Sequence, residues 1–507
     1  MACICILISI VFYLLFMVGV GLWYTRRNTS ADDFYLGGRK LGPYVTAMSA
    51  EASDMSSWLL MGLPGLAFFN GLADPFWTAA GLALGTYLNW LLVAKRLRCY
   101  SAELGAITVP EFFTKRFGDR RRLLQGLAAL VILVFFVPYT ASGFAACGKL
   151  FGTLFGASYV PAMLISAIVI VAYTTCGGFK AASVTSFIQS LIMIFALVVV
   201  MIFGVSAAGG WDSVFANARE IPGYLSLTAS TNIQSAEATS YSTLTIFSLL
   251  AWALGYFGMP HVLIHFMAAE DENKIKVSRR VGTAWVVISL AVAVLIGIIG
   301  FAMASNGSIK MFDSSSSAES LIVSIASLLG SKGVLLAILA GVILAGILSA
   351  TMSTADVQLL AAASGIAHNI INDVLGIKLS EKKSIIVARV TVICVAVLGF
   401  LFALDPNSSV FRIVSFAWAG FGATFGPVML FGLFWKRCNK WGAIAGMVSG
   451  AAMVFIWKYA IAPMGGVLAI YELLPAFVIS CVFIVAVSLL TKAPEAEIVA
   501  EFESVGK

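Results

Sequence analysis

An aspartate stands in the middle of an apolar run near the N-terminus, surrounded by small hydroxyl residues. Asp54 lies in the stretch SAEASDMSSW (49–58), next to Ser53 and close to Ser56 and Ser57. An ionised carboxylate at the centre of a bilayer costs about 2.5–3.5 kcal/mol on insertion scales. A hard cation held by oxygens would compensate that charge, so we expect a cation site here, with sodium the best match. The alternative is a structural role, in which Asp54 caps a second half-helix.

A second oxygen-rich stretch, GILSATMSTADVQ (346–358), interrupts another apolar run. Ser349, Ser353 and Asp356 are spaced i, i+4 and i+7, so they share one face of a helix, and Thr354 lies beside them. These hydroxyls could join the same cation site. The alternative is hydrogen bonding between helices, at about 0.6 kcal/mol per bond, or bonding to the helix's own carbonyls.

The composition shows what kind of protein carries these residues. Of 507 residues, 60% are hydrophobic and 11% charged, and the mean hydropathy is +0.97. These values exclude a water-soluble enzyme and predict an all-α polytopic protein of the bilayer. The net charge of +7 does not imply nucleic acid, because most basic residues fall in short loops between apolar runs. The eight cysteines form no disulfide framework or metal cluster, and no cofactor is expected.

The apolar runs predict thirteen membrane spans, at about 3–24, 41–70, 72–94, 123–147, 159–178, 183–208, 238–262, 281–304, 319–365, 384–404, 409–434, 441–458 and 468–491. If the first span starts outside, the inner segments hold 26 of the 32 lysines and arginines. This bias predicts an outer N-terminus and an inner C-terminus. Residues 1–494 then form a single transporter domain, and 495–507 form a short cytosolic tail.

Two spans contain breaks that a plain membrane helix would not tolerate. The second carries SAEASDMSSW, and the seventh carries WALGYFGMPH (252–261), where we expect Pro260 to cause the break and His261 to be a hydrogen-bonded backbone partner. Interrupted helices occur in a bilayer only where the freed backbone faces protein, water or a ligand. Each broken span is the first of a set of five spans, at about 41–208 and 238–434, as in an inverted-repeat transporter.

Five motifs identify a resemblance to a known family. They are SAEASDMSSWLLMGLPG, FYLGGRKLGP, LGYFGMPH, MSTADVQLL and SFAWAGFGATFGPVML. Over about residues 8–494 the chain resembles the solute:sodium symporter family, and most closely its sodium/proline branch. The resemblance implies a LeuT-type bundle of five plus five helices, with one extra helix in front and two behind, that works by alternating access. It also implies a multi-pass protein of the cell membrane.

The resemblance also implies the positions of the ion and substrate sites. The sodium-binding positions that match are Ala52, Asp54, Met55, Ala350, Ser353 and Thr354. In the family, backbone carbonyls supply the ligands at the positions of Ala52, Met55 and Ala350, and hydroxyls at those of Ser353 and Thr354. Asp54 matches an essential carboxylate near the ion.

Proline is a small zwitterion with an apolar ring, so its site should combine a half-helix N-terminus or hydroxyl with aromatic faces. The matching substrate positions are Ser56, Trp58, Tyr139, Trp252 and Tyr256. Trp252 and Tyr256 lie one turn apart just before the second break, so they can line a single wall. For any one of these aromatics the alternative is core packing or an interfacial belt.

Four residues depart from the family pattern. Where relatives commonly carry glycine, leucine, aspartate and serine, this chain has Glu51, Lys180, Ser186 and Asp356. In some relatives the aspartate replaced by Ser186 belongs to a second sodium site. We therefore assign Asp356, Ser186 and Glu51 to a candidate second cation or proton site. The alternative is that Asp356 or Glu51 pairs with Lys180.

Together these features predict a sodium-coupled symporter that imports L-proline or a similar small amino acid. One alternative is a proton-coupled symporter of another small organic solute, because Glu51 and Asp356 are carboxylates in membrane spans. The other is a transporter-like sensor, which the short tail disfavours. An ATP-driven pump is disfavoured because no GxxxxGK[ST] loop is present. The oligomeric state is not predicted.

Overall fold

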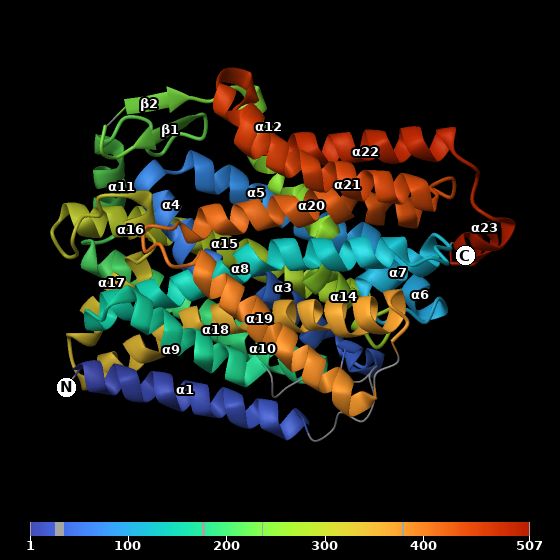
Figure 1. The fold of residues 1–507 in the computed structure, drawn as a ribbon. Helices are drawn as coiled ribbons and strands as arrows, with labels where there is room; N and C mark the ends of the chain where they lie inside the picture. The colour runs from blue at the N-terminus through green and yellow to red at the C-terminus, as the bar shows by residue number, and fades with distance from the viewer. Residues whose placement is uncertain (1, 26–34, 175–177, 236, 378–379, 506–507) are drawn as a thin grey trace.

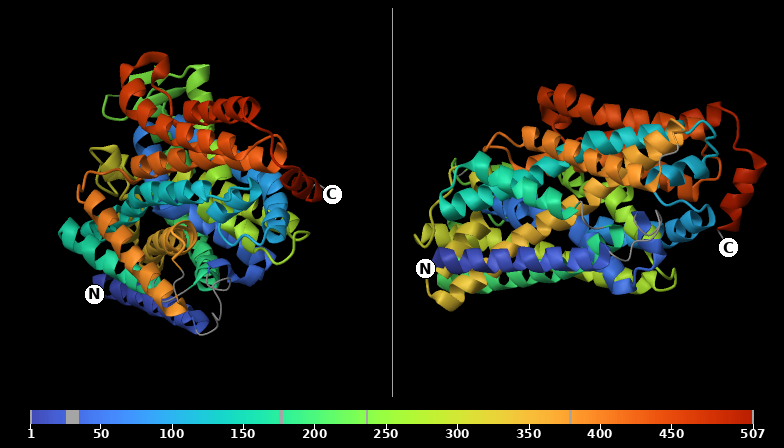
Figure 2. Two further views of the ribbon diagram at one scale, coloured as in Figure 1. Left: turned by 45° about the vertical axis from the view of Figure 1, so that its right-hand side comes forward. Right: turned by 60° about the horizontal axis from the view of Figure 1, so that its bottom comes forward.

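The computed structural model describes residues 2–25, 35–174, 178–235, 237–377 and 380–505. These residues form one bundle of long helices that run roughly along a common direction (Figure 1). The chain enters at one end of the bundle and leaves at the other, in all three ribbon views (Figures 1 and 2). This placement agrees with an odd number of crossings.

The first half of the chain holds α1, one broken helix and four further long or medium helices, with shorter helical segments between them. Its elements are α1 (Ala2–Thr25), η1 (Gly37–Arg39), α3 (Pro43–Ser57), η2 (Trp58–Gly62), α4 (Leu63–Asn70), α5 (Ala73–Leu88), η3 (Asn89–Ala94), α6 (Lys95–Glu103), α7 (Val109–Arg116), α8 (Leu123–Phe155), α9 (Tyr159–Thr174) and α10 (Phe179–Ala207). The segment that links it to the second half contains α11 (Trp211–Glu220) and a small antiparallel hairpin of β1 (Ala229–Asn232) and β2 (Glu237–Ser240). This hairpin is a departure from the predicted all-α fold.

The second half repeats the pattern. Its elements are α12 (Thr243–Leu250), α13 (Trp252–Gly255), η4 (Tyr256–Gly258), α14 (Pro260–Ala268), α15 (Ile275–Ser305), α16 (Ser315–Ala318), α17 (Leu321–Gly330), α18 (Val334–Ser364), η5 (Gly365–Val374), α19 (Glu381–Phe402) and α20 (Val410–Phe434). The chain ends with α21 (Lys440–Ile456), η6 (Trp457–Ile461), η7 (Ala462–Met464), η8 (Gly466–Leu468), α22 (Leu473–Leu490) and α23 (Ala496–Ser504). The helix α23 lies in the predicted tail.

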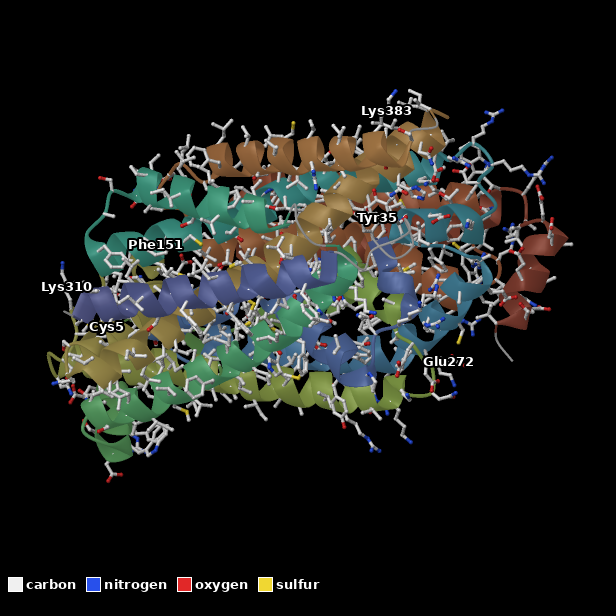
Figure 3. All side chains as sticks on the ribbon, turned by 90° about the horizontal axis from the view of Figure 1, so that it is seen from below. Cys5, Tyr35, Phe151, Glu272, Lys310 and Lys383 are labelled. Carbon is white, nitrogen blue, oxygen red and sulfur yellow. The ribbon has the colours of Figure 1, made fainter. Side chains whose placement is uncertain are left out.

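Charged and apolar side chains divide between the ends and the flank of the bundle. In Figure 3, Lys310 lies at the end where α1 begins, and Glu272 and Lys383 lie towards the other end. The flank exposes large apolar side chains, among them Phe12 and Leu15 of α1, which are 72% and 65% exposed. An apolar belt between two charged ends is the surface that a bilayer requires.

One predicted span is wrong. The stretch 319–365 does not form a single helix, because the chain turns at residues 331–333, where Gly333 adopts a φ of +156°. The first part is the short helix α17, and α18 starts afresh at Val334. Within the described residues, nine helices are long and apolar enough to cross a membrane, or ten if the bent pair α12–η4 and α14 is one span. The total of thirteen spans stays a prediction, since 41–70, 159–178 and 384–404 correspond to broken or shorter helices.

The second broken helix crosses α20 with almost no space between the two backbones. A Cβ added to Gly422 would lie 2.7 Å from the Cα of Gly255, and a Cβ on Gly255 would collide with the Trp418 indole. The same indole donates its N–H to the carbonyl of Trp252, at 2.9 Å. Small residues allow this close packing, and the tryptophan then fixes the helix end that leads into the break.

We predict that Gly255→Ala destabilises the fold by roughly 1–3 kcal/mol, because the added methyl group must displace the Trp418 indole. The matched control is Gly19→Ala, since a Cβ at that helical position meets nothing within 4 Å. Thermal unfolding in detergent, followed by size-exclusion chromatography of heated samples, measures both variants. Equal thermal stability of the two variants would contradict the close crossing.

Candidate functional site

The helix α3 breaks at Ser56, in the middle of the bundle. Ser56 has a φ of +48° and a ψ of −170°, a conformation that is rare for residues other than glycine, and it is 3% exposed. Side chains of two other helices bond to carbonyls near this break. The Ser353 hydroxyl of α18 donates to the Ala52 carbonyl at 2.8 Å, and the Tyr139 hydroxyl of α8 donates to the Asp54 carbonyl at 2.9 Å. The predicted break is therefore confirmed, and two side chains hold it in place.

Four of the expected ion-binding residues lie together between α3 and α18. Besides its bond to Ala52, the Ser353 hydroxyl lies 3.2 Å from the Ala350 carbonyl, to which Thr354 also donates at 3.1 Å. All four residues are buried. Two carbonyls and two small hydroxyls are neutral oxygen ligands of the kind sodium takes. The Met55 carbonyl is at the same break, where it accepts the backbone N–H of Trp58.

The Asp54 side chain makes its contacts on another side of α3. One carboxylate oxygen, Oδ1, is 3.6 Å from Nε2 of His261 on α14, and the carboxylate also lies beside the Tyr256 hydroxyl. Among the described residues neither ring nitrogen of His261 has a hydrogen-bond partner. The expectation that His261 is a hydrogen-bonded partner of the backbone is therefore wrong for its ring, and only its carbonyl is bonded, at 2.7 Å from Nδ1 of His265.

Aromatic side chains from both broken helices surround a small central cavity. Its lining consists of Asp54, Met55, Trp58, Leu82, Tyr139, Trp252, Val414 and Trp418. The rings of Trp58 and Trp252 are 5.5 Å apart, and the buried indole N–H of Trp58 has no hydrogen-bond partner in the described part of the chain. Of the expected substrate residues, Trp58, Tyr139 and Trp252 line this cavity. Ser56 contributes to an adjoining cavity, with Tyr139 and Thr354.

The fifth expected substrate residue, Tyr256, lies behind the aromatic wall. Its ring packs edge-on against Trp418, at 5.0 Å, and its hydroxyl lies beside Asp54 and Thr86. The sequence analysis did not identify the face of α20 that completes the wall. Val414 and Trp418 line the cavity, and Phe411 stacks on Trp58 at 5.6 Å. Their i, i+3, i+7 spacing within an aromatic motif is the signal that could have found them.

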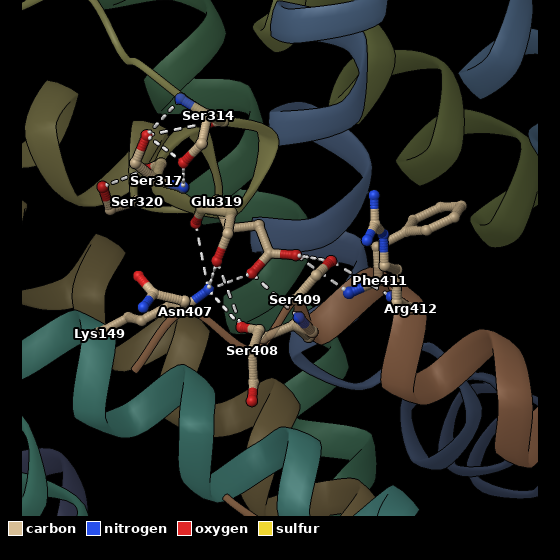
Figure 4. A network of polar contacts seen from close by, with 12 residues as sticks. Lys149, Ser314, Ser317, Glu319, Ser320, Asn407, Ser408, Ser409, Phe411 and Arg412 are labelled. Carbon is tan, nitrogen blue, oxygen red and sulfur yellow. Dashed lines mark hydrogen bonds and ion pairs between the residues drawn. The ribbon is translucent and has the colours of Figure 1, made fainter. Parts of the chain in front are cut away.

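A buried ion pair anchors the start of α20, the helix that completes the aromatic wall. Glu319, which is 1% exposed, accepts from Lys149 Nζ at 2.6 Å and from the backbone N–H groups of Val410 and Phe411 at 3.0 and 3.1 Å (Figure 4). The carboxylate thus binds the N-terminus of α20, where the helix dipole favours a negative charge. The pair joins α8, the α16–α17 junction and α20 directly beside the Phe411 ring.

The three residues of the candidate second site do not converge. The Glu51 carboxylate accepts from Trp90 Nε1 at 2.7 Å, on the α5–η3 side of α3. Asp356 accepts from the Thr174 hydroxyl of α9 at 2.6 Å, and Ser186 is buried on α10. Among ion pairs between described side chains, none joins Lys180 to Glu51, so that expected pairing is not seen.

Comparison with known proteins agrees with this geometry. The model of the sodium:solute symporter family matches residues 34–450. The osmoregulated proline transporter OpuE of Bacillus subtilis is 40% identical over 96% of this chain and 95% of its own length. The sodium/proline symporter of Escherichia coli is 40% identical over 97% of this chain and 94% of its own.

Two solved structures confirm the fold class. A Na+-coupled sialic acid symporter in its substrate-bound outward-open state aligns with a TM-score of 0.77 at 17% identity, over 97% of this chain and 99% of its own. Mhp1, a nucleobase-cation-symport-1 family transporter, aligns with a TM-score of 0.55 at 15% identity, over 94% and 99%. The chain therefore has the LeuT-type fold that the family resemblance implied.

Proposed function

The chain belongs to the sodium:solute symporter family, and from this membership we propose that it imports L-proline, or a similar small amino acid, together with sodium. It is a multi-pass membrane transporter and not an enzyme. One observation carries the proposal: the Ser353 hydroxyl of α18 meets the Ala52 carbonyl at the break of α3, beside a cavity lined by aromatic residues. The names of the relatives from two bacteria support proline as the substrate.

The ion site couples two parts of the bundle. Sodium would replace the hydrogen bonds that Ser353 and Thr354 donate to the carbonyls of Ala52 and Ala350: both hydroxyls would keep their protons and turn an oxygen lone pair to the cation, and Ala52, Met55 and Ala350 would offer carbonyls. Such an ion stabilises only the arrangement in which α3 and α18 are close enough to share it. A ligand shifts a conformational equilibrium by its differential affinity for the two states. Sodium therefore favours the state with an ordered α3 break, and that break forms part of the substrate cavity.

The aromatic cavity suits a small zwitterion with an apolar ring. Trp58, Trp252 and Trp418 offer flat apolar faces, and such faces also attract a secondary ammonium group. The half-helix that starts after Ser56 directs its N-terminus towards the break, and a helix N-terminus favours a carboxylate. Ser56 and Tyr139 add hydroxyls at the same place, and Tyr256 supports the wall from behind.

A proton-coupled symporter is the second candidate function. Glu51 is fully buried inside the bundle and has no ion-pair partner in the described part of the chain, and a carboxylate of this kind can carry a proton across a membrane. Asp356 and Ser186 remain candidates for a further cation or proton site near α9 and α10. Separate sodium and proton gradients distinguish the two functions.

We predict that proteoliposomes containing the protein accumulate labelled L-proline when an inward sodium gradient is imposed. Uptake should collapse to the level of protein-free vesicles when potassium replaces sodium. An inward proton gradient without sodium should not restore it, because the α3–α18 oxygens are neutral ligands for a metal cation. Accumulation driven by protons alone would favour the second function.

We predict that the double variant Ser353→Ala/Thr354→Ala raises the half-saturating sodium concentration about tenfold or more, since a loss of about 1.4 kcal/mol in ion binding is a tenfold change. The control is Ser364→Ala on the same helix, whose hydroxyl bonds only to its own helix at Ala361. Sodium-dependent proline uptake measures all variants at equal surface expression. An unchanged sodium requirement would remove the hydroxyl pair from the ion site.

We predict that Trp252→Ala weakens proline binding about tenfold or more and changes sodium binding less than about threefold, because the indole lines the cavity, whereas the ion-binding hydroxyls of Ser353 and Thr354 do not. Trp252→Phe should recover most of the affinity. The exposed Trp441 provides the control, Trp441→Ala. Equilibrium binding of both ligands separates a substrate contact from a folding role, in which both affinities would fall together.

A further inference from the structure

Five buried side chains with polar oxygens gather on the side of α3 that faces away from Ser353. We name this group the Glu51 chamber; its members are Glu51, Asp54, Thr86, Asn89 and Tyr256. They come from α3, α5, η3 and η4, and none is more than 3% exposed. The chamber is therefore closed by helices on all sides.

Each member has one oxygen for which the described residues supply no hydrogen-bond partner. These atoms are Glu51 Oε2, Asp54 Oδ1, Thr86 Oγ1, Asn89 Oδ1 and the Tyr256 hydroxyl oxygen. The Tyr256 hydroxyl lies beside both Asp54 and Thr86. Buried polar atoms in proteins are nearly always bonded. The Tyr256 hydroxyl can bond to Asp54 and Thr86, but Glu51 Oε2 and Asn89 Oδ1 are acceptors that these contacts leave without a donor, and they point to a ligand.

Other contacts hold the chamber in shape. Trp90 Nε1 donates to the second oxygen of Glu51, Oε1, at 2.7 Å, and Asn89 Nδ2 donates to the Tyr256 carbonyl at 3.0 Å. These bonds use the N–H groups of Trp90 and Asn89 and leave Glu51 Oε2 and Asn89 Oδ1 without a donor. Gly282 of α15 brings its backbone close to the Glu51 carboxylate, because an added Cβ would lie 3.0 Å from Oε1.

The charge of the chamber identifies the class of ligand. Glu51 and Asp54 are one turn apart on α3, and no lysine or arginine of the described chain forms an ion pair with either of them. The basic group nearest to Asp54 is the ring of His261, at 3.6 Å from Oδ1. Two carboxylates surrounded by a hydroxyl, a phenol and an amide oxygen complement a hard cation.

We propose that the Glu51 chamber binds a second sodium ion, separate from the ion between α3 and α18. The two sites lie towards different neighbours of α3, since the Ala52 carbonyl accepts from Ser353 of α18, whereas the Glu51 carboxylate accepts from Trp90 of η3. The inference rests on the proposed use of sodium as the coupling ion.

Equilibrium binding of radioactive sodium to the purified full-length protein in detergent tests this inference without any substrate. The wild type should bind about two sodium ions per chain and Glu51→Gln about one. Ser353→Ala/Thr354→Ala should also bind about one at the sodium concentration that just saturates the wild type, because it keeps the chamber and weakens the other site about tenfold or more. Glu472→Gln is the control, since it removes a buried carboxylate that pairs with Lys458 outside the chamber, and it should bind about two.

A wild type that binds one ion, or a Glu51→Gln variant that binds two, would overturn the second site. If Glu51→Gln fails to fold, Thr86→Val takes its place, because it keeps both carboxylates and removes one oxygen ligand. This variant should weaken sodium binding at one of the two sites several-fold. Unchanged sodium affinities at both sites would overturn the proposal. Failure of the proposed function gives a different result: sodium binds, but labelled proline is not accumulated.

Discussion

Inside a bilayer every backbone N–H and C=O group needs a hydrogen-bond partner, and the break of α3 at Ser56 frees several of these groups from their own helix. In the structure, Ser353 bonds to the carbonyl of Ala52 and Tyr139 to that of Asp54. Ser353 belongs to α18 and Tyr139 to α8, so both partners come from other helices than the broken one. The break therefore exists only while α8 and α18 stand next to α3, and any ligand that changes this arrangement changes the substrate cavity as well.

The break places different chemistry on different sides of one helix. Neutral oxygens face α18, the aromatic cavity lies beside the break, and the carboxylates of Glu51 and Asp54 face α5 and η4. The ion pair of Lys149 and Glu319 fixes the start of α20, which carries Val414 and Trp418 of the cavity lining. Ion and substrate binding are coupled through α3, because both ligands bind to residues of this helix and therefore favour the same position of it.

Much of this arrangement could be predicted from the sequence, because polar residues and breaks stand out against an apolar background. Asp54, Ser353 and the WALGYFGMPH stretch are conspicuous for that reason, and the family resemblance added the aromatic residues. The turn at Gly333 and the bond from Glu319 to the start of α20 could not be predicted. Both depend on contacts between segments far apart in the chain, such as residues 319 and 411. Trp418 was overlooked because aromatic residues on a membrane helix mostly serve packing.

Hydrogen exchange of the purified protein tests the central claim, that sodium binding orders the α3 break against α18. Peptides that cover 49–58 and 346–358 should exchange more slowly when sodium replaces potassium, without any substrate present. Peptides from the peripheral helix α21 should not change. This pattern follows because an ion that binds the ordered state suppresses local opening at its ligands. Exchange at the break that is identical in sodium and potassium would contradict the account.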